Sequence, residues 1–199
     1  GAKNHEVWFC DLQHHHHPNY LKCDVRHFRQ LQEVFANHVF DYVYHLAAEF
    51  GRHNGEDYYE NLWQTNVVGT KNIIVLQRQY GFRLVFFSSS EVYGDYDGIM
   101  HEDVLERIPI RQLNDYAMTK WVNERQIQNA SDAHQTESVR VRLFNIYGPG
   151  ERYSPYRSAV CVFIYRALHG LSYKVYLDHH RSSLFIEDAV ETLTNVVDN

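Results

Sequence analysis

Residues 84–94 read Leu-Val-Phe-Phe-Ser-Ser-Ser-Glu-Val-Tyr-Gly, an apolar run that passes directly into three hydroxyl groups and a carboxylate. The apolar half predicts a strand buried on both faces of a sheet. Similar short runs alternate with helix-length amphipathic segments up to about Leu143, which predicts βαβ units. The predicted fold class is therefore α/β with a doubly wound parallel sheet. The polar residues after the strand then lie at the carboxyl edge of the sheet, where such folds bind ligands.

The expected elements follow from this alternation. Strands are expected at residues 6–10, 20–23, 42–46, 84–88 and 139–143, and helices at 26–36, 57–80 and 115–129. After Gly148-Pro149-Gly150 the pattern changes to an aromatic helix at 156–168, a strand at 173–177 and the start of a helix at Glu187-Asp188. We therefore expect a Rossmann-like domain over residues 1–150 and, over 151–199, the beginning of a smaller substrate-binding region.

Composition and charge restrict the classes of function. With 199 residues, 44% of them hydrophobic, the chain has enough apolar material for one core. Its formal charge of −6, without a basic run, argues against nucleic acid as a partner. No apolar run approaches the roughly 20 residues of a membrane-spanning helix. The protein is expected to be cytoplasmic, with neither nucleic acid nor a membrane as a partner.

Cysteine and histidine give no metal signal. Cys10, Cys23 and Cys161 lack the paired spacing of a zinc site and the even count of a disulfide framework, so reduced thiols are expected. The run His14 to His17 lies in a polar stretch closed by Pro18, without a ligand-spaced cysteine or carboxylate. We expect a solvated loop there and no metal site.

Tyr116 and Lys120 are four residues apart, which places them on one face of the helix expected at 115–129. A tyrosine with its usual pKa near 10 is a poor base at neutral pH and needs a nearby cation to favour the phenolate. Lys120 is positioned to be that cation. Such a pair is often only a helix surface, but the hydroxyl cluster at the end of the preceding strand favours a catalytic pair.

The motifs together carry a family resemblance. They are the 88–94 segment, the Tyr116/Lys120 pair, residues 142–150 (Arg-Leu-Phe-Asn-Ile-Tyr-Gly-Pro-Gly), and Arg181 ahead of Glu187-Asp188. In this order, they resemble the extended short-chain dehydrogenases, NAD-dependent epimerases and dehydratases that act on nucleotide sugars. The resemblance covers nearly the whole chain and implies NAD as cofactor and a nucleotide-diphosphate sugar as substrate.

The resemblance also implies roles for residues of the reaction centre. Ser89 would hydrogen-bond the 4-hydroxyl of the sugar, and Tyr116 would remove its proton while hydride passes to nicotinamide. Lys120 would hold the nicotinamide ribose and tune the tyrosine. Asn145 would meet the bound substrate, and Arg181 would clamp its diphosphate, which suits the planar guanidinium.

On the cofactor side, Asp11 ends the first expected strand, where an acidic residue binds the adenosine ribose 2′-hydroxyl and favours NAD over NADP. Asp24-Val25 resembles the contact with the adenine edge, and Leu46-Ala47-Ala48 the loop beside the cofactor diphosphate. Any buried strand can end in such residues, so each is a weak signal alone. The expected cofactor-binding residues are Asp11, Asp24, Val25, Leu46, Ala47, Ala48, Ser88, Tyr116 and Lys120.

The sequence departs from the family at its start. The family opens with a strand and a glycine-rich turn that cradles the pyrophosphate, and the chain begins at Gly1-Ala2-Lys3 without them. We therefore expect a fragment of a longer enzyme, incomplete at both ends, in which the 199-residue polypeptide binds NAD weakly or not at all. Tight retention of NAD by the purified polypeptide would contradict this prediction.

The residues after Ser89 bear on the reaction that follows oxidation at C4. Glu91 stands where dehydratases place an acid-base glutamate, and the pair Ser90-Glu91 is similar to GDP-mannose dehydratases and UDP-glucuronate decarboxylases. We expect Ser90 and Glu91 to belong to the catalytic group, with Glu91 also meeting substrate. The alternative for Glu91 is a carboxylate that only interacts with backbone N–H groups at the start of a helix.

Other functions remain open at this point. A simple 4-epimerase, a catalytically silent NAD-fold binding module, and a reductase of small carbonyl compounds all fit the same fold. Arg181 and the Gly148-Pro149-Gly150 segment favour a diphosphate substrate over the small carbonyl compound. The resemblance also implies a homodimer formed through the helix at 57–80 and the helix of Tyr116, for which the aromatic residues Tyr58, Tyr59 and Trp63 are candidates.

Overall fold

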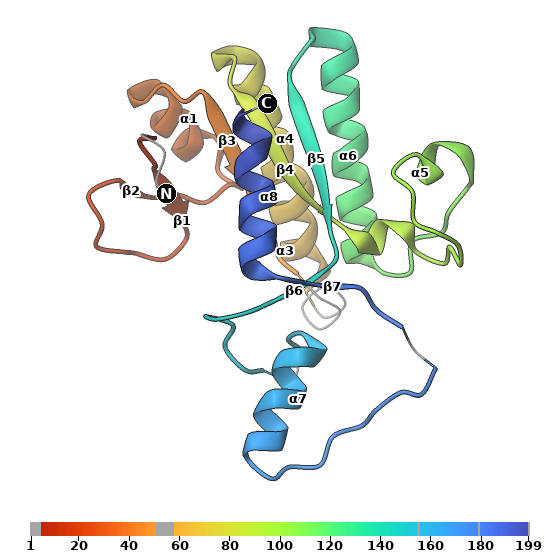
Figure 1. The fold of residues 1–199 in the computed structure, drawn as a ribbon. Helices are drawn as coiled ribbons and strands as arrows, with labels where there is room; N and C mark the ends of the chain where they lie inside the picture. The colour runs from red at the N-terminus through yellow and green to blue at the C-terminus, as the bar shows by residue number, and fades with distance from the viewer. Residues whose placement is uncertain (1–4, 51–57, 155, 179, 199) are drawn as a thin grey trace. The chain divides into compact units, whose positions relative to one another are not determined.

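A computed structural model describes residues 5–50, 58–154, 156–178 and 180–198 (Figure 1). Contacts divide the chain into two compact units, residues 1–141 and 142–199, and each is described by itself. The predicted division at residue 150 stays a prediction. The predicted α/β class with parallel strands is confirmed. None of the described helices has the length and apolar character needed to cross a bilayer.

The first unit is built on two small groups of strands. Strand β1 (Phe9–Asp11) pairs in parallel with β2 (Tyr20–Lys22). A second sheet has the order β3-β4-β5, and β3 and β4 are parallel. Its strands are β3 (Tyr42–His45), β4 (Arg83–Ser89) and β5 (Ser138–Leu143), the last of which continues into the second unit. All five predicted strands up to residue 143 are thus present, with each end within three residues of the predicted one.

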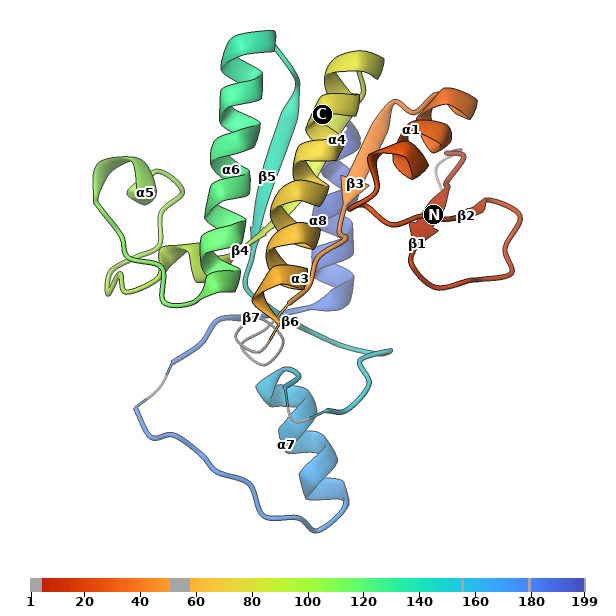
Figure 2. The same cartoon turned by 180° about the vertical axis from the view of Figure 1, so that it is seen from behind.

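Helices pack on this sheet mainly through one apolar core, and a smaller separate cluster contains Val92, Tyr93 and Val104. The helices are α1 (Phe28–Asn37), α3 (Tyr59–Trp63), α4 (Gly69–Tyr80), the short α5 (Val104–Arg107) and α6 (Asp115–His134). The core joins α1, α4, β4 and α6 through buried side chains such as Phe35, Ile74, Leu76, Phe86 and Ile127. Figure 2 shows α4 and α6 side by side over the sheet. Strand β4 is buried along most of its length, whereas β5 is partly exposed, with Val139 44% exposed.

The long helix predicted at 57–80 is continuous from Tyr59 to Tyr80, but its middle is wider than an α-helix. Residues Gln64–Val68 form a π-helical segment, η1, between α3 and α4. Its Asn66 is only 1% exposed. Such single-turn π segments often occur at functional sites. The predicted start at Asp57 lies outside the described residues.

Helix α6 begins where predicted and ends five residues later than the predicted end at Asn129. Asn114 caps its start, because the side-chain Oδ1 accepts the N–H of Ala117 at 2.8 Å. At the other end Gln135 has φ of 55° and donates its N–H to the Ser131 carbonyl at 2.8 Å. Residues 130–134 are therefore the last turn of the helix, which is closed by a residue in the left-handed conformation.

The second unit contains a two-stranded parallel ladder and two helices. Strand β6 (Asn145–Tyr147) pairs with β7 (Ser183–Phe185), and the helices are α7 (Ala159–Leu168) and α8 (Ile186–Asp198). Helix α7 starts three residues later than predicted, since Ser158 caps it by accepting the Cys161 N–H at 3.1 Å. Glu187 and Asp188 lie in the first turn of α8, as predicted.

The strand predicted at 173–177 is wrong. These residues form no strand, and Val175, Tyr176 and Leu177 are 61%, 77% and 84% exposed. The alternation of apolar and polar residues is typical of a strand, but a strand also needs a hydrogen-bonding partner. In the described part of this unit, β6 pairs instead with β7, which lies later in the chain.

Candidate active site

Strand β4 carries the serine cluster to its carboxyl end. Ser88 is buried, and its hydroxyl donates to Glu124 Oε1 of α6 at 2.5 Å. Ser89 ends the strand, and its Oγ accepts the N–H of Glu91 at 3.2 Å. Residues Ser90–Tyr93 form a short 3₁₀ helix, η2. The strand therefore ends in a tight turn that places Ser89 and Glu91 beside each other.

The backbone conformation and close surroundings of Gly94 explain why this turn ends in a glycine. Its φ is 49° and its ψ is −118°, a conformation that residues with a Cβ rarely adopt. A Cβ at this position would also collide with the carbonyl group of Arg111. The residue type is therefore required by the backbone, which folds back against a second segment at this point.

Asn114 connects Glu91 to the helix of Tyr116. Its Nδ2 donates to Glu91 Oε2 at 2.8 Å, while its Oδ1 caps α6 through the N–H of Ala117. One amide thus fixes both the carboxylate and the first turn of the helix. Asn114 was not predicted from the sequence as a site residue, although an asparagine directly before an expected helix start is a recognisable capping signal.

Lys120 and Tyr116 lie on the same side of α6, as their spacing predicts. Lys120 is buried, and its Nζ donates to the Phe87 carbonyl at 2.6 Å. The ammonium lies 5.0 Å from the centre of the Phe86 ring and 5.7 Å from the centre of the Tyr116 ring. The structure therefore brings the strand end and the helix pair into one group, made of Ser89, Glu91, Tyr116 and Lys120.

The pKa values in this group are set mainly by burial. Burial raises the pKa of Tyr116 to about 12, the charge of Glu91 adds to the rise, and a hydrogen bond with Ser89 opposes it. Burial also lowers the pKa of Lys120 to about 8. The lowered Tyr116 pKa that we expected from the neighbouring Lys120 is therefore not found, because desolvation disfavours the phenolate and raises the pKa instead.

A network of buried polar residues stabilises the first half of α6. Asn66 of η1 accepts the Glu49 N–H at 2.8 Å and donates to Thr119 Oγ1 at 3.0 Å. Thr119 in turn donates to the Tyr116 carbonyl at 2.8 Å, and Asn123 Nδ2 donates to the Asn66 carbonyl at 2.8 Å. These residues hold the turn that carries Tyr116. Sequence reasoning missed them, although a polar Asn66 on the apolar face of a helix was a usable signal.

His45 is a second buried polar residue that the sequence did not single out. It ends β3, and its Nε2 lies 3.0 Å from Thr70 Oγ1. Burial, with the nearby charge of Lys120, lowers its pKa to about 3. His45 is therefore neutral at physiological pH and serves as a hydrogen-bonding residue of the core beneath the site.

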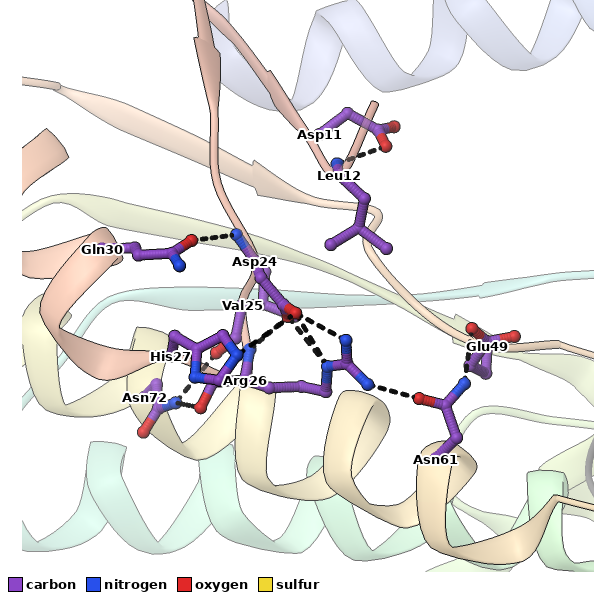
Figure 3. A network of polar contacts seen from close by, with 10 residues as sticks. All are labelled: Asp11, Leu12, Asp24, Val25, Arg26, His27, Gln30, Glu49, Asn61 and Asn72. Atoms are coloured by element: carbon purple, nitrogen blue, oxygen red, sulfur yellow. Dashed lines mark hydrogen bonds and ion pairs between the residues drawn. The ribbon is translucent and has the colours of Figure 1, made fainter. Parts of the chain in front are cut away.

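Six of the nine expected cofactor residues lie at the carboxyl ends of β1, β2 and β3 or within three residues after them. Asp11 is exposed, and its Oδ1 accepts the Leu12 N–H at 2.6 Å, while Asp24 is held by Arg26 (Figure 3). Leu46 and Ala47 are exposed directly after β3, and Ala48 is half-buried. The strand ends thus place these residues at ligand-binding positions of an α/β sheet.

The groups present have the chemistry that NAD requires. The carboxylates of Asp11 and Asp24 are acceptors suited to the hydroxyl and amino groups of adenosine. The buried ammonium of Lys120, beside Tyr116, suits a ribose hydroxyl. The roles of individual residues, including Ser88, whose hydroxyl is engaged by Glu124, stay predictions.

The expected substrate residues of the second unit lie near each other within that unit. Asn145 begins β6, and its Nδ2 donates to the Ser182 carbonyl at 3.3 Å. Arg181 is exposed one residue earlier, just before β7. The parallel ladder thus brings two residues 36 positions apart in the sequence to the same end of β6 and β7. Their contact with substrate stays a prediction.

No group of three or more histidine, cysteine, aspartate or glutamate residues at metal-binding distance occurs among the residues that the structure describes. The run His14 to His17 is exposed, as expected for a solvated loop, and the rings of His14 and His16 are 4.8 Å apart.

Comparison with known proteins identifies the family of this chain. Residues 2–199 match the NAD dependent epimerase/dehydratase family. The chain is 32% identical over 172 residues to UDP-N-acetyl-alpha-D-glucosaminuronate decarboxylase of Bacillus cytotoxicus, covering 84% of this chain and 53% of that protein. It is 30% identical over 181 residues to dTDP-glucose 4,6-dehydratase of Neisseria meningitidis, covering 84% and 50%. The chain spans about half the length of these curated relatives.

A solved structure gives the same result in three dimensions. The UDP-glucose 4-epimerase of Thermus thermophilus, determined in complex with NAD, superposes with a TM-score of 0.74 at 25% identity, covering 88% of this chain and 58% of that one. Relatives therefore include a decarboxylase, a dehydratase and an epimerase of nucleotide sugars. The match along almost the entire chain places this protein in the NAD-dependent epimerase/dehydratase family, whose cofactor is NAD.

Proposed function

We propose that the protein carrying this chain oxidises C4 of a nucleotide-linked sugar and then eliminates water or carbon dioxide from the oxidised sugar. The observation that carries the proposal is the grouping of Ser89, Glu91, Tyr116 and Lys120 around the end of β4. Bound NAD would accept the hydride from C4. Tyr116 is the base for the 4-hydroxyl proton, Ser89 orients that hydroxyl, and Lys120 holds the nicotinamide ribose.

Glu91 favours dehydration or decarboxylation over simple epimerisation. Its Oε2 accepts from Asn114 at 2.8 Å, which orients the carboxylate beside Ser89 while the other oxygen remains available for proton transfer. A carboxyl group held beside the reacting hydroxyl can take the proton from the carbon next to the 4-keto group in a dehydration, or return a proton to that carbon after carbon dioxide has left in a decarboxylation. In a plain 4-epimerase that proton transfer is not needed.

The proposal is tested by incubating the protein with NAD and a panel of UDP-, GDP-, dTDP- and CDP-sugars and measuring the masses of the products by mass spectrometry. Loss of water marks a dehydratase, loss of carbon dioxide marks a decarboxylase, and an altered sugar of unchanged mass marks an epimerase. If no sugar nucleotide is altered, the proposed function is wrong.

The substitution Glu91→Gln separates the two steps. We expect oxidation at C4, seen as absorbance of the reduced nicotinamide, to be retained. Formation of the dehydrated or decarboxylated product should slow by about 10²- to 10⁴-fold, because the variant cannot take the proton from the neighbouring carbon in dehydration or return one to that carbon after carbon dioxide leaves. Glu106→Gln, an exposed glutamate on α5, is the matched control and should behave as the wild type. Equal product release by both variants would leave Glu91 with only a structural role.

We further propose a cytoplasmic homodimer that pairs through α3, α4 and α6. The exposure of Tyr58 and Tyr59, at 67% and 57%, supports this pairing, whereas Trp63 is half-buried and donates its Nε1 to Asp115 Oδ2 at 3.1 Å. Light scattering on the purified protein measures the mass directly.

A further inference from the structure

Cys10 and Cys23 lie on the same face of the ladder formed by β1 and β2. Cys10 pairs with Leu21 in the parallel register, and side chains two residues apart on a strand share a face, so Cys23 follows Leu21 on the face of Cys10. The N–H of Cys23 donates to the Asp11 carbonyl at 2.9 Å, which continues the hydrogen bonding of the ladder past Lys22. The two cysteines are therefore diagonal neighbours on adjacent strands.

The two thiols are in contact, but their surroundings differ. Both are free, and their side chains share a hydrogen bond. Cys10 is exposed, whereas Cys23 is only 3% exposed and belongs to the apolar core together with Leu31 and Phe35 of α1. A small reagent in solution therefore reaches Cys10 first, and the thiol that lies next to it is Cys23.

The shared hydrogen bond makes the two thiols unequal in acidity. It lowers the pKa of Cys10, against burial and the charge of Asp11, and it raises the pKa of Cys23. The thiolate is the form of cysteine that reacts with peroxides. Cys10 is thus the more accessible of the two thiols and also the one that ionises more readily.

A disulfide between these residues requires a small movement of the strand ends. Diagonal neighbours on adjacent strands have Cα atoms about 7–8 Å apart, whereas a disulfide joins Cα atoms about 4.4–6.8 Å apart. Strands β1 and β2 have three residues each, and in the described part of the chain they pair only with each other. Such short strands, of which β1 is exposed along its whole length, open at a low cost in free energy. A disulfide closed by this movement is strained and is therefore readily reduced again.

The same movement reaches two of the expected cofactor residues. Asp11 directly follows Cys10 in the sequence, and Asp24 directly follows Cys23. Figure 3 shows the two carboxylates that these residues present beyond the ladder. Drawing the strand ends together displaces both carboxylates from the positions described above.

We propose that Cys10 and Cys23 form a reversible disulfide when a peroxide oxidises the exposed thiol, and that closing this bond weakens the binding of NAD. The effect on NAD rests on the proposed function, in which Asp11 and Asp24 meet the cofactor. The formation of the disulfide rests only on the placement of the two thiols.

The oxidation balances with one molecule of hydrogen peroxide. The Cys10 thiolate attacks a peroxide oxygen, the O–O bond breaks, and Cys10 becomes a sulfenic acid as the first water is released. The sulfur of Cys23 then attacks the sulfur of Cys10, the S–O bond breaks, and the departing hydroxide leaves as a second water with the proton of Cys23. Two thiols and one peroxide thus give one disulfide and two waters.

The test treats the protein carrying this chain with hydrogen peroxide and maps its cysteines by proteolysis and mass spectrometry without a reductant. We expect a pair of peptides joined through Cys10 and Cys23, with a mass lower by two hydrogen atoms. Calorimetry should show that the oxidised protein binds NAD about tenfold or more weakly, because hydrogen bonds to the displaced carboxylates are lost. Dithiothreitol should remove the bond and restore the affinity.

Two variants separate the steps of the oxidation. In Cys23→Ala the reaction should stop at the sulfenic acid of Cys10, which dimedone traps, because the second thiol is absent. Cys10→Ser should form neither the trapped adduct nor the disulfide, and its binding of NAD should not respond to peroxide. Because Cys10 is exposed, this variant keeps the inference testable even if Cys23→Ala fails to fold.

Cys161→Ser is the matched control, since Cys161 is a partly exposed free thiol on α7 in the second unit. This variant should form the disulfide and lose affinity for NAD as the wild type does.

The outcomes distinguish this inference from the function beneath it. If the reduced protein converts a nucleotide sugar but peroxide gives no disulfide between Cys10 and Cys23, the inference is overturned and the proposed function stands. The same holds if the disulfide forms and the affinity for NAD is unchanged. If the reduced protein neither binds NAD nor converts a sugar nucleotide, both are overturned.

Discussion

Tyr116→Phe is expected to lower turnover of the nucleotide sugar by about 10²- to 10⁴-fold, because the substitution removes the hydroxyl that takes the proton from the sugar. The ring remains, so its packing against the Lys120 side chain is kept. Binding of NAD and the temperature of unfolding should therefore change little. Steady-state turnover, calorimetry with NAD and thermal unfolding of the same preparations measure the three quantities.

Tyr59→Phe is the matched control for this variant, since Tyr59 is 57% exposed on α3 and outside the reaction centre. It should keep wild-type turnover. A catalytically silent binding module would show no difference between the two variants, and that result would remove Tyr116 from the mechanism.

We also expect Tyr116→Phe to change the pH dependence of turnover. The pKa of Tyr116 is raised to about 12 by burial and by Glu91, so only a small fraction is phenolate near neutral pH. Turnover by the wild type should rise as the pH is raised through the neutral range, where Lys120, with its pKa lowered to about 8, still carries most of its charge. The residual activity of Tyr116→Phe should lack this rise.

Phe86→Ala is expected to lower the free energy of unfolding by about 3–5 kcal/mol, the usual cost of removing a buried aromatic side chain. Phe86 is 1% exposed in the middle of β4 and belongs to the core shared by α1, α4 and α6. Urea denaturation followed by circular dichroism measures the change. Phe50→Ala, at a residue 44% exposed, is the control and should cost about 0.5 kcal/mol or less.

Loss of the Phe86 ring should also reach the reaction centre. The ring covers Lys120 Nζ at 5.0 Å, and burial holds the pKa of Lys120 down. Water entering the space left by the ring should raise that pKa towards its usual range. A destabilisation below about 1 kcal/mol would show that the core of β4 is not packed as described.

The strongest predictions from the sequence concerned elements with local signals. The apolar run before Ser88 predicted β4, and the spacing of Tyr116 and Lys120 placed both on one helix, which the structure has as α6. These features depend on the periodicity of neighbouring residues, and tertiary contacts only reinforced them. The strand predicted at 173–177 failed for the opposite reason, since a strand needs a partner that local periodicity does not specify.

The candidate site shows the same division. Ser89, Glu91, Tyr116 and Lys120 were found from their motifs, but Asn66 and Asn114 were not, because their importance lies in contacts with distant residues. Asn66 meets Thr119 across 53 positions of the sequence, and Asn114 meets Glu91 across 23. No local pattern encodes which pairs of polar side chains will be buried together.

The sequence by itself determined the α/β class, the family and the residue types at the end of β4. Only the tertiary structure decided the electrostatic state of Tyr116, whose pKa is raised because packing removes water from the hydroxyl. It also decided the bracing of Asp24 through Arg26, Asn61 and Glu49, which joins three segments far apart in the chain. Residue order specifies the chemical groups, whereas their solvation and partners follow from how the helices and strands pack.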